Sequence, residues 1–414
     1  MLIQDKEKKL IFFLLSLLPI SIILGSSISL INIVLLSLII LVIIYYEKDI
    51  GFIKNSSLKL LFSLYLYLIF NSIISQDYFI GIERNLGFIR FILLFICINY
   101  FFFKYQDSNH VFYFWIFCII LVTFDSHIEF FFGQNIFGWG SIDQPHGSRI
   151  VSFFKDEPIV GAYLSAFILI IFGFLLSKYK HKNILPWLFI IFTFSAILIS
   201  GERSNTIKIF LGLTLMFLFF DFINTKKKVT IISLTIILLV FLLNTSNYLK
   251  TRYVHQFISN FLSKEKFENF SKNSDYFQLY KSGFSVFMNY PIFGVGNKNY
   301  RVETCGDEIK NKINNYYCLT HPHQIYIEFL AEHGLVGTSI ILGIFFSLMF
   351  KILLNIFKSK NYTQIGTFCY VLSVFIPLLP SGSFFSDLNS TLLWLNISLM
   401  FACCKKTNIF NYKV

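Results

Sequence analysis

The stretch Ser27–Tyr46, SISLINIVLLSLIILVIIYY, contains no charged residue. About 20 mostly apolar residues are enough for a helix to cross the hydrocarbon core of a bilayer, so this stretch predicts a membrane-spanning helix. The whole chain of 414 residues has the same character, with 55% hydrophobic and only 14% charged residues. Soluble domains carry about 25% charged residues. The composition therefore excludes a soluble enzyme, a secreted disulfide scaffold and a disordered chain, and predicts an all-α, polytopic membrane protein.

Similar apolar stretches follow one another along most of the chain. We expect about twelve spanning helices from their length and hydropathy. They are centred on residues 10–24, 27–46, 58–75, 87–105, 111–132, 158–177, 184–200, 205–223, 229–247, 335–357, 363–380 and 387–404.

The net charge of +12 would fit a nucleic-acid-binding protein, but the distribution of the lysines indicates membrane topology instead. Lysines cluster at every second connection between apolar stretches and at both ends of the chain, and positive residues mark cytoplasmic loops. The clusters lie at residues 6–9, 48–54, 104, 178–182, 226–228, 358–360 and 405–413. The pattern predicts that both termini are cytoplasmic, and we expect no nucleic-acid partner.

Two of the outer connections are too long to be simple turns, namely residues 133–157 and 248–334. Long connections in compact proteins are usually functional. We therefore divide the chain into residues 1–247, with nine spans and the first long loop, residues 248–334, a large periplasmic loop with the densest polar chemistry, and residues 335–414, with three spans and a cytoplasmic C-terminus.

The chain has 29 Lys but only six Arg, and all six are expected in outer loops or in the outer part of a span. Arginine offers a planar fork that matches phosphate or carboxylate oxygens and keeps its charge when partly desolvated. This placement indicates an anion site at the outer membrane boundary; the alternative is that the arginines pair with loop carboxylates. The six are Arg84, Arg90, Arg149, Arg203, Arg252 and Arg301.

Two of these arginines have informative neighbours. Arg90 lies inside an apolar run, where an ionisable group is costly and marks function unless its side chain reaches the membrane surface. Arg203 follows Ser200-Gly-Glu202 at the expected start of a helix, where free N–H groups and the helix dipole favour a phosphate. Glu202 is the competing explanation, as a structural partner of Arg203.

The densest chemistry is the segment Thr320-His-Pro-His-Gln-Ile-Tyr-Ile-Glu-Phe-Leu-Ala-Glu-His-Gly-Leu-Val-Gly337. Proline suits the first turn of a helix, so we expect His323 in the first turn of a helix that continues into the tenth span. Its imidazole would be kept neutral by the helix dipole and would accept a proton from a sugar hydroxyl; the alternative is a purely structural histidine. Gly334 and Gly337 are expected on one helix face, where they permit close packing.

His321 and His323 also raise the possibility of a metal site. Residues two apart on a helix do not face together, so we expect none.

The cysteines fall into two classes. Cys305 and Cys318 lie in the long outer loop and would close a disulfide in an oxidising periplasm, unless they remain free thiols. The remaining five lie in or near spans and are interpreted as packing residues: Cys97, Cys118, Cys369, Cys403 and Cys404.

Several of these segments together resemble a known family. His323-Gln324, nine residues and Gly334-Leu-Val-Gly337 are similar to the His-(Asn/Ser/Gln)-x9-Gly-x-x-Gly signature of O-antigen ligases, within the ligase/polymerase superfamily of bacterial surface polysaccharides. The resemblance extends to four further segments, Pro291–Arg301, Gly201–Arg203, Arg149–Glu157 and Pro380–Phe385.

The resemblance implies a glycosyltransferase of the GT-C type in the bacterial inner membrane, with its active site facing the periplasm and no cofactor. The donor would be a glycan on undecaprenyl pyrophosphate and the acceptor a sugar hydroxyl of lipid A-core, with inversion at the anomeric carbon. His323 would be the general base, and Arg203 and Arg301 would bind the pyrophosphate.

Supporting roles are implied for Arg90, Arg149 and Gln324, and for the acidic pair Asp156-Glu157, which would orient Arg149 or His323. Some family members have an arginine where this chain has Tyr276, so Arg252 and Arg149 are further candidates for the second pyrophosphate contact.

Two other functions fit part of the sequence. A polysaccharide polymerase would use the same donor but a lipid-linked glycan as the acceptor. A transporter of lipid-linked glycans would need ionisable residues at the bilayer midplane and paired broken helices, whereas the charged candidates here gather at one face.

Overall fold

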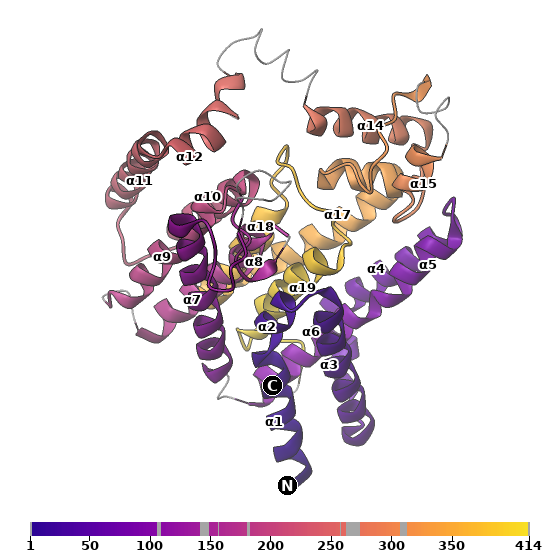
Figure 1. Cartoon of the computed structure of the whole chain (residues 1–414). Helices are drawn as coiled ribbons and strands as arrows, with labels where there is room; N and C mark the ends of the chain where they lie inside the picture. Colours follow the sequence, from indigo (N-terminus) through magenta and orange to yellow (C-terminus); the bar gives the residue numbers. More distant parts are fainter. Residues whose placement is uncertain are drawn as a thin grey trace.

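The computed structural model describes residues 2–105, 109–140, 149–155, 157–179, 183–256, 258–261, 274–306 and 313–412. Within these ranges the chain is helical and contains no β-strand, so the all-α prediction is confirmed (Figure 1). The first half contains α1 (Leu2–Ser16), α2 (Leu18–Ile23), α3 (Ser26–Glu47), η1 (Gly51–Lys54), α4 (Ser56–Ile73), α5 (Tyr78–Gly87), α6 (Ile89–Lys104), α7 (Asn109–Phe132), η2 (Ser152–Phe154), α8 (Val160–Tyr179) and α9 (Leu185–Ile199). The second half contains α10 (Arg203–Leu218), α11 (Thr225–Thr245), α12 (Asn247–Leu249), η3 (Lys250–His255), η4 (Ile258–Phe261), α14 (Asp275–Asn289), α15 (Tyr300–Cys305), α17 (Ile325–Ser359), α18 (Tyr362–Val374) and α19 (Asp387–Ala402).

A helix lies in each of the twelve apolar stretches, and the first stretch is divided between α1 and α2. Among the described residues, six helices are long and apolar enough to cross a membrane: Ser26–Glu47, Ser56–Ile73, Tyr78–Lys104, Asn109–Phe132, Val160–Tyr179 and Ile325–Ser359. The protein is thus a polytopic helical membrane protein, while the count of twelve spans and the GT-C type stay predictions.

Helix α8 forms the centre of the bundle and is buried along most of its length. It packs against α9 and α18. A Cβ added at Gly366 of α18 would lie 2.1 Å from the carbonyl oxygen of Leu169, and one at Gly173 would lie 2.2 Å from that of Tyr362. Small residues at these crossings therefore allow the two backbones to approach closely, as is common between membrane helices.

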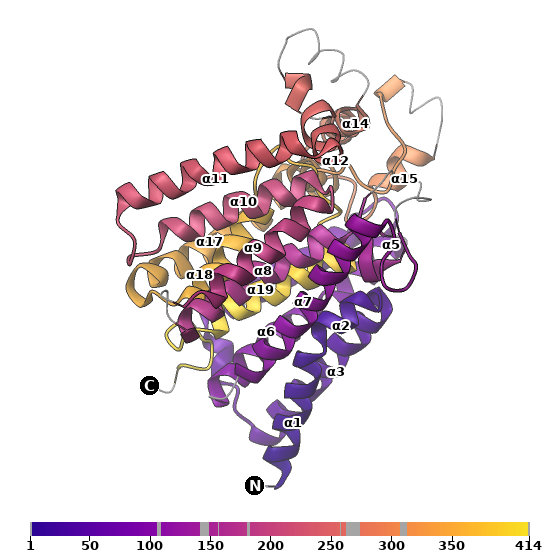
Figure 2. The same ribbon diagram turned by 60° about the vertical axis from the view of Figure 1, so that its left-hand side comes forward.

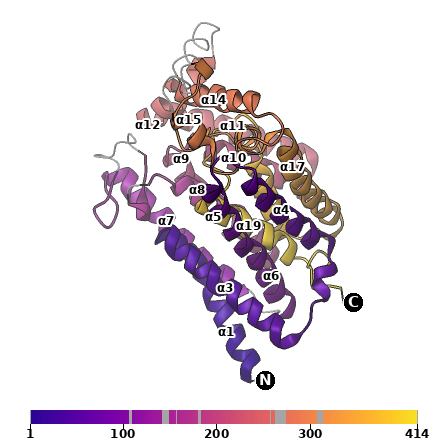
Figure 3. The same cartoon turned by 90° about the vertical axis from the view of Figure 1, so that its right-hand side faces the viewer.

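The described helices α12, α14 and α15 from the long connection 248–334 lie at one end of the bundle. Figures 2 and 3 show α12, α14 and α15 at the end remote from both chain termini. This arrangement agrees with a topology in which both termini share one side of the membrane and the long loop lies on the other.

Candidate functional site

The site is organised by a break in α17. Gly334 has φ 62° and ψ −167° within this helix, which frees hydrogen-bonding groups on both sides. The segment Pro291–Gly296 supplies the partners: the N–H groups of Val295 and Gly296 donate to the carbonyls of Ala331 and Glu332, at 3.0 and 2.9 Å. The N–H of Leu335 donates to the carbonyl of Pro291 at 2.8 Å. The segment Pro291–Arg301 and the histidine–glycine motif, which both carry the family resemblance, thus meet at this break.

The glycines explain how closely these segments approach. A Cβ at Gly294 would lie 2.4 Å from the carbonyl carbon of Glu332, and one at Gly334 would lie 2.4 Å from the carbonyl carbon of Ile292. Gly337 contacts Tyr67 of α4 in the same way. The expectation that Gly334 and Gly337 lie on one continuous helix face was wrong, because the backbone turns at Gly334, but both do permit close packing.

His323 precedes the helix and is not in its first turn, which corrects the prediction from Pro322. Helix α17 begins at Ile325, and the Gln324 side chain caps it by accepting a hydrogen bond from the N–H of Ile327 at 2.8 Å. His323 has a left-handed φ of 53°, which is strained for a residue with a side chain. The N–H of Ser381 donates to the His323 carbonyl at 2.9 Å and holds this conformation.

The loop that carries Ser381 is itself attached to α17. The buried carboxylate of Glu328 accepts hydrogen bonds from the Ser383 hydroxyl at 2.6 Å and from the Phe384 N–H at 2.9 Å. The late loop of the family resemblance, Pro380–Phe385, therefore fixes the backbone at His323.

The two histidines stack on each other. Their ring centroids are 4.0 Å apart, and the Thr320 hydroxyl is 2.9 Å from Nδ1 of His321. The helical spacing that was expected to separate them does not apply, because neither is in the helix. No group of three His, Cys, Asp or Glu that could hold a metal occurs within the described part of the chain.

Burial keeps both imidazoles neutral near pH 7. It lowers the pKa of His323, which remains half-buried. It lowers the pKa of His321 to about 3, with further contributions from His323 and the Lys298 charge. A base with so low a pKa accepts protons weakly, so His323 is the better proton acceptor of the pair.

Three arginines gather on one side of the histidines. Arg203, the first residue of α10, donates through Nη1 to the Gln256 carbonyl at 3.1 Å. Arg252, in the π-helical turn η3, donates to the Gly201 carbonyl and to Oε1 of Gln256, each at 3.0 Å. Burial lowers the pKa of both Arg203 and Arg252, and the charge of Arg149 lowers both further. We name Arg149, Arg203 and Arg252 the arginine cluster.

Tyr276 connects the arginine cluster to the histidines. It interacts electrostatically with Arg203 and Arg252, and its ring centroid lies 6.0 Å from that of His323. Tyr276, the residue that departs from the family pattern, thus neighbours His323 and influences Arg203 and Arg252 of the arginine cluster.

The segment that carries Arg149 is anchored on α7 by two buried carboxylates. Glu129 accepts hydrogen bonds from the N–H groups of Val151 and Ser152, at 3.1 and 2.6 Å. Asp125 accepts one from the Ser152 hydroxyl at 2.5 Å. These bonds hold the backbone two and three residues after Arg149, whose Nε is buried and has no hydrogen-bond partner among the described residues.

Glu202 is an acidic neighbour of the arginine cluster. Glu202 accepts hydrogen bonds from the N–H groups of Gly161 and Ala162 at the start of α8, and from the Asn205 amide. Burial raises the pKa of Glu202 to about 7, opposed in part by these bonds and by the charge of Arg149. Glu157 is exposed, and Asp156 lies outside the described residues.

A second group of cations lies near the histidines and is linked to them through Thr320, whose hydroxyl is 2.9 Å from Nδ1 of His321. Arg84, Arg90, Lys298 and Arg301 line an open pocket of about 400 Å³ together with Ile80, Glu83 and Thr320. Nη1 of Arg84 and Nη2 of Arg90 each donate to Oδ1 of Asp387 at 2.7 Å. We name this the four-cation pocket.

Together the two groups contain all six arginines of the chain. The pair predicted to hold one pyrophosphate, Arg203 and Arg301, is divided between them. The Arg90 side chain is only 14% exposed, and its guanidinium pairs with Asp387 within the protein.

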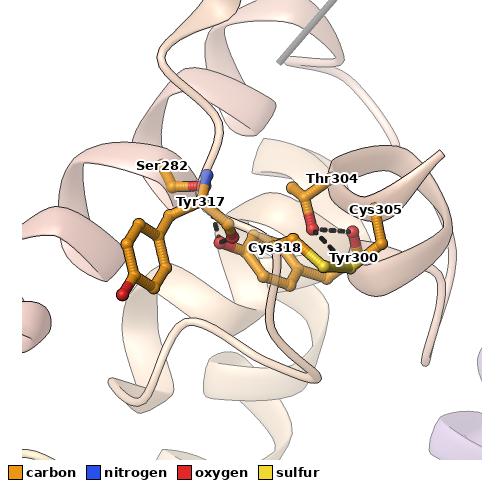
Figure 4. The surroundings of a disulfide bond; sticks show 6 residues. All are labelled: Ser282, Tyr300, Thr304, Cys305, Tyr317 and Cys318. Atoms are coloured by element: carbon orange, nitrogen blue, oxygen red, sulfur yellow. Dashed lines mark hydrogen bonds between the residues drawn. A yellow bond between two sulfur atoms is a disulfide. The ribbon is translucent and has the colours of Figure 1, made fainter. Parts of the chain in front are cut away.

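Cys305 and Cys318 form a disulfide. Figure 4 shows its surroundings, where the Ser282 hydroxyl lies 2.7 Å from that of Tyr300 and accepts a hydrogen bond from the Tyr317 N–H at 2.8 Å. This network ties α14, α15 and the segment before Thr320 together. The disulfide therefore connects α15, which carries Arg301, to the segment that leads to His323.

Three residues of the site were missed in the sequence. Lys298 lies three residues before Arg301, a spacing that would have suggested a shared face. Thr320 carries no signal beyond its place beside His321. Asp387 was missed because its partners lie about 300 positions away in the chain.

The fold and site define the class as a multi-pass helical membrane protein with a histidine pair near two groups of cations. Residues 188–342 match the model of the O-antigen ligase family, which confirms the resemblance over this part of the chain. The matched region runs from α9 into α17 and includes Arg203, Arg252, Arg301 and His323. No match was found among curated proteins.

Proposed function

We propose that this protein is an O-antigen ligase that transfers a glycan from undecaprenyl pyrophosphate to a sugar hydroxyl of lipid A-core at the periplasmic face of the inner membrane. The observation that supports the proposal is the position of Tyr276, whose ring centroid lies 6.0 Å from that of His323 and which interacts electrostatically with Arg203 and Arg252. The family match supports ligase or polymerase chemistry in general.

In the proposed reaction His323 takes the proton of the acceptor hydroxyl. The hydroxyl oxygen forms a bond to the anomeric carbon, and the bond from that carbon to the phosphate oxygen breaks. The electron pair leaves with the pyrophosphate, and attack from the opposite face inverts the anomeric centre.

The arginine cluster suits a pyrophosphate leaving group. Arg252 donates to uncharged oxygens of Gly201 and Gln256, which do not neutralise its charge, and Arg149 and Arg252 each have a buried Nε without a protein partner among the described residues. Preorganised cations stabilise the charge that develops on a leaving group, so no general acid or metal ion is required. We propose Arg203 with Arg252 and Arg149 as the donor site.

The test is reconstitution of the purified protein in liposomes with an undecaprenyl-pyrophosphate glycan, a chelator and lipid A-core. The proposal expects glycosylated lipid A-core in the presence of the chelator. In a parallel sample without lipid A-core, a lengthened lipid-linked glycan would instead identify a polymerase. Loss of transfer with the chelator, restored by a divalent cation, would contradict the metal-independent mechanism.

A further inference from the structure

We propose that the four-cation pocket binds an anionic group, a phosphate or a carboxylate, carried by the acceptor glycan close to its reacting hydroxyl. This inference rests on the proposed function and extends it from the donor to the acceptor.

The charge of the pocket points to an anionic ligand. Its wall contains four cations and one carboxylate, that of the exposed Glu83. Asp387 accepts from Arg84 and Arg90, so these six charged groups together carry an excess of two positive charges. Asp387 also orients both guanidiniums by accepting at a single oxygen. Charge-assisted hydrogen bonds from such groups favour phosphate and carboxylate over neutral sugars.

Two of the cations are held by the backbone and not by Asp387. Lys298 lies in a left-handed conformation with φ 64°, between Asn297 and Asn299, both fully buried. The N–H of Asn297 donates to Oδ1 of Asn71 at 2.8 Å, and Oδ1 of Asn299 accepts from the Asp77 N–H at 2.7 Å. These bonds present Lys298 to the pocket, and the exposed Arg301 follows at the start of α15.

The position of the pocket indicates the acceptor and not the donor. Thr320 lines the pocket, and its hydroxyl contacts His321, which stacks on His323. His323 in turn neighbours Tyr276, with ring centroids 6.0 Å apart, and Tyr276 interacts electrostatically with Arg203 of the arginine cluster. A base that activates the acceptor hydroxyl must lie between acceptor and donor. With the pyrophosphate at the arginine cluster, the four-cation pocket is on the acceptor side.

The contact through Thr320 and His321 also limits where the anionic group sits on the acceptor. A group in this pocket lies beside the histidines, so it belongs to the reacting sugar or to its immediate neighbour. A lipid pyrophosphate at the far end of a long acceptor glycan does not meet this condition.

The experiment compares Arg301→Gln and Lys298→Gln with Lys281→Gln, an exposed cation on α14 outside the pocket. Transfer is measured with lipid A-core and with the same acceptor after phosphatase treatment. We expect Arg301→Gln and Lys298→Gln to raise the acceptor KM about tenfold or more, because each loses a charge-assisted hydrogen bond. The donor KM stays unchanged, and Lys281→Gln behaves as wild type.

The acceptor arms identify the source of the anionic group. Phosphatase treatment that raises the wild-type KM and removes the difference between wild type and Arg301→Gln assigns the pocket to a phosphate. If the KM difference between wild type and Arg301→Gln survives phosphatase treatment but disappears after reduction of the acceptor's carboxyl groups, the pocket is assigned to a carboxylate. A rise in the donor KM with the acceptor KM unchanged would overturn the inference and return Arg301 to the donor site.

A binding measurement separates this inference from the proposed function. Soluble core oligosaccharide, released from lipid A and still phosphorylated, is titrated into the full-length protein in nanodiscs. Weaker binding to Arg301→Gln than to Lys281→Gln supports the pocket even if wild type transfers no glycan. Equal binding by all variants, together with normal wild-type transfer, refutes the pocket and leaves the proposed function intact.

Discussion

The arginine cluster and the four-cation pocket differ in what satisfies their charges. In the pocket, Arg84 and Arg90 share a carboxylate oxygen of Asp387, so two of the four cations are held by an ion pair within the protein. In the cluster, Arg252 donates to carbonyl and amide oxygens, and the like charge of Arg149 lowers the pKa of both other arginines. Hydrogen bonds to uncharged oxygens leave the charge of Arg252 available to a strongly charged ligand, whereas the charges of Arg84 and Arg90 are already balanced in part by Asp387.

The largest expected effect concerns the residue between the two regions. His323→Ala should lower the transfer rate by about a hundredfold to ten-thousandfold, which is the usual contribution of a general base. His321→Ala should cost much less, because the low pKa of His321 makes it a weak proton acceptor. Both are measured by turnover in reconstituted liposomes. Equal losses in the two variants would contradict the assignment of the base to His323.

The next effect uses one substitution in both regions. Arg203→Lys should lower the transfer rate about tenfold to a hundredfold, because an ammonium cannot reproduce the planar fork at a diphosphate. Arg84→Lys should change it only a few-fold, since a lysine retains a point charge next to Asp387. The reverse order of sensitivity would place the pyrophosphate in the four-cation pocket.

A smaller effect is expected from the disulfide that links the two motif segments. Cys305→Ser combined with Cys318→Ser should reduce the free energy of unfolding by about 2–4 kcal/mol, the typical contribution of a disulfide. Thermal unfolding with and without a reductant provides the measurement. Wild type should lose stability on reduction while the double variant does not respond; an identical response of the two would contradict this role.

The smallest effect is a displacement of the pH profile. Burial lowers the pKa of His323 below its usual value of about 6.5, so the neutral, proton-accepting form persists at more acidic pH. Transfer should stay level as the pH falls to about 6.5 and decline only below it. An acid limb at or above pH 7 would indicate that protonated His323 is favoured by its surroundings.

Much of the fold could be predicted from apolar run length, since every one of the twelve stretches contains a helix. The local geometry at His323 could not. A proline is equally compatible with the position just before a helix and with the first turn of the helix. The cap that the Gln324 side chain provides decides that this helix begins at Ile325. Gly334 was likewise ambiguous, because a glycine suits both close packing and a break.

The grouping of the arginines depended on contacts between distant segments. The predicted topology places them on the outer side, but no spacing indicated that Arg84 and Arg90 share Asp387 or that Arg301 lies with them. Arg252 lies in the π-helical turn η3, which the sequence does not mark.

The central claim is that His323 acts between a donor site at the arginine cluster and an acceptor site at the four-cation pocket. The most direct measurement is an experimental structure of the protein with undecaprenyl pyrophosphate bound. We predict phosphate oxygens about 2.7–2.9 Å from the guanidinium nitrogens of Arg203 and Arg252, on the Tyr276 side of His323. A diphosphate bound instead among Arg84, Lys298 and Arg301, or at the end of the bundle that holds the termini, would contradict the account.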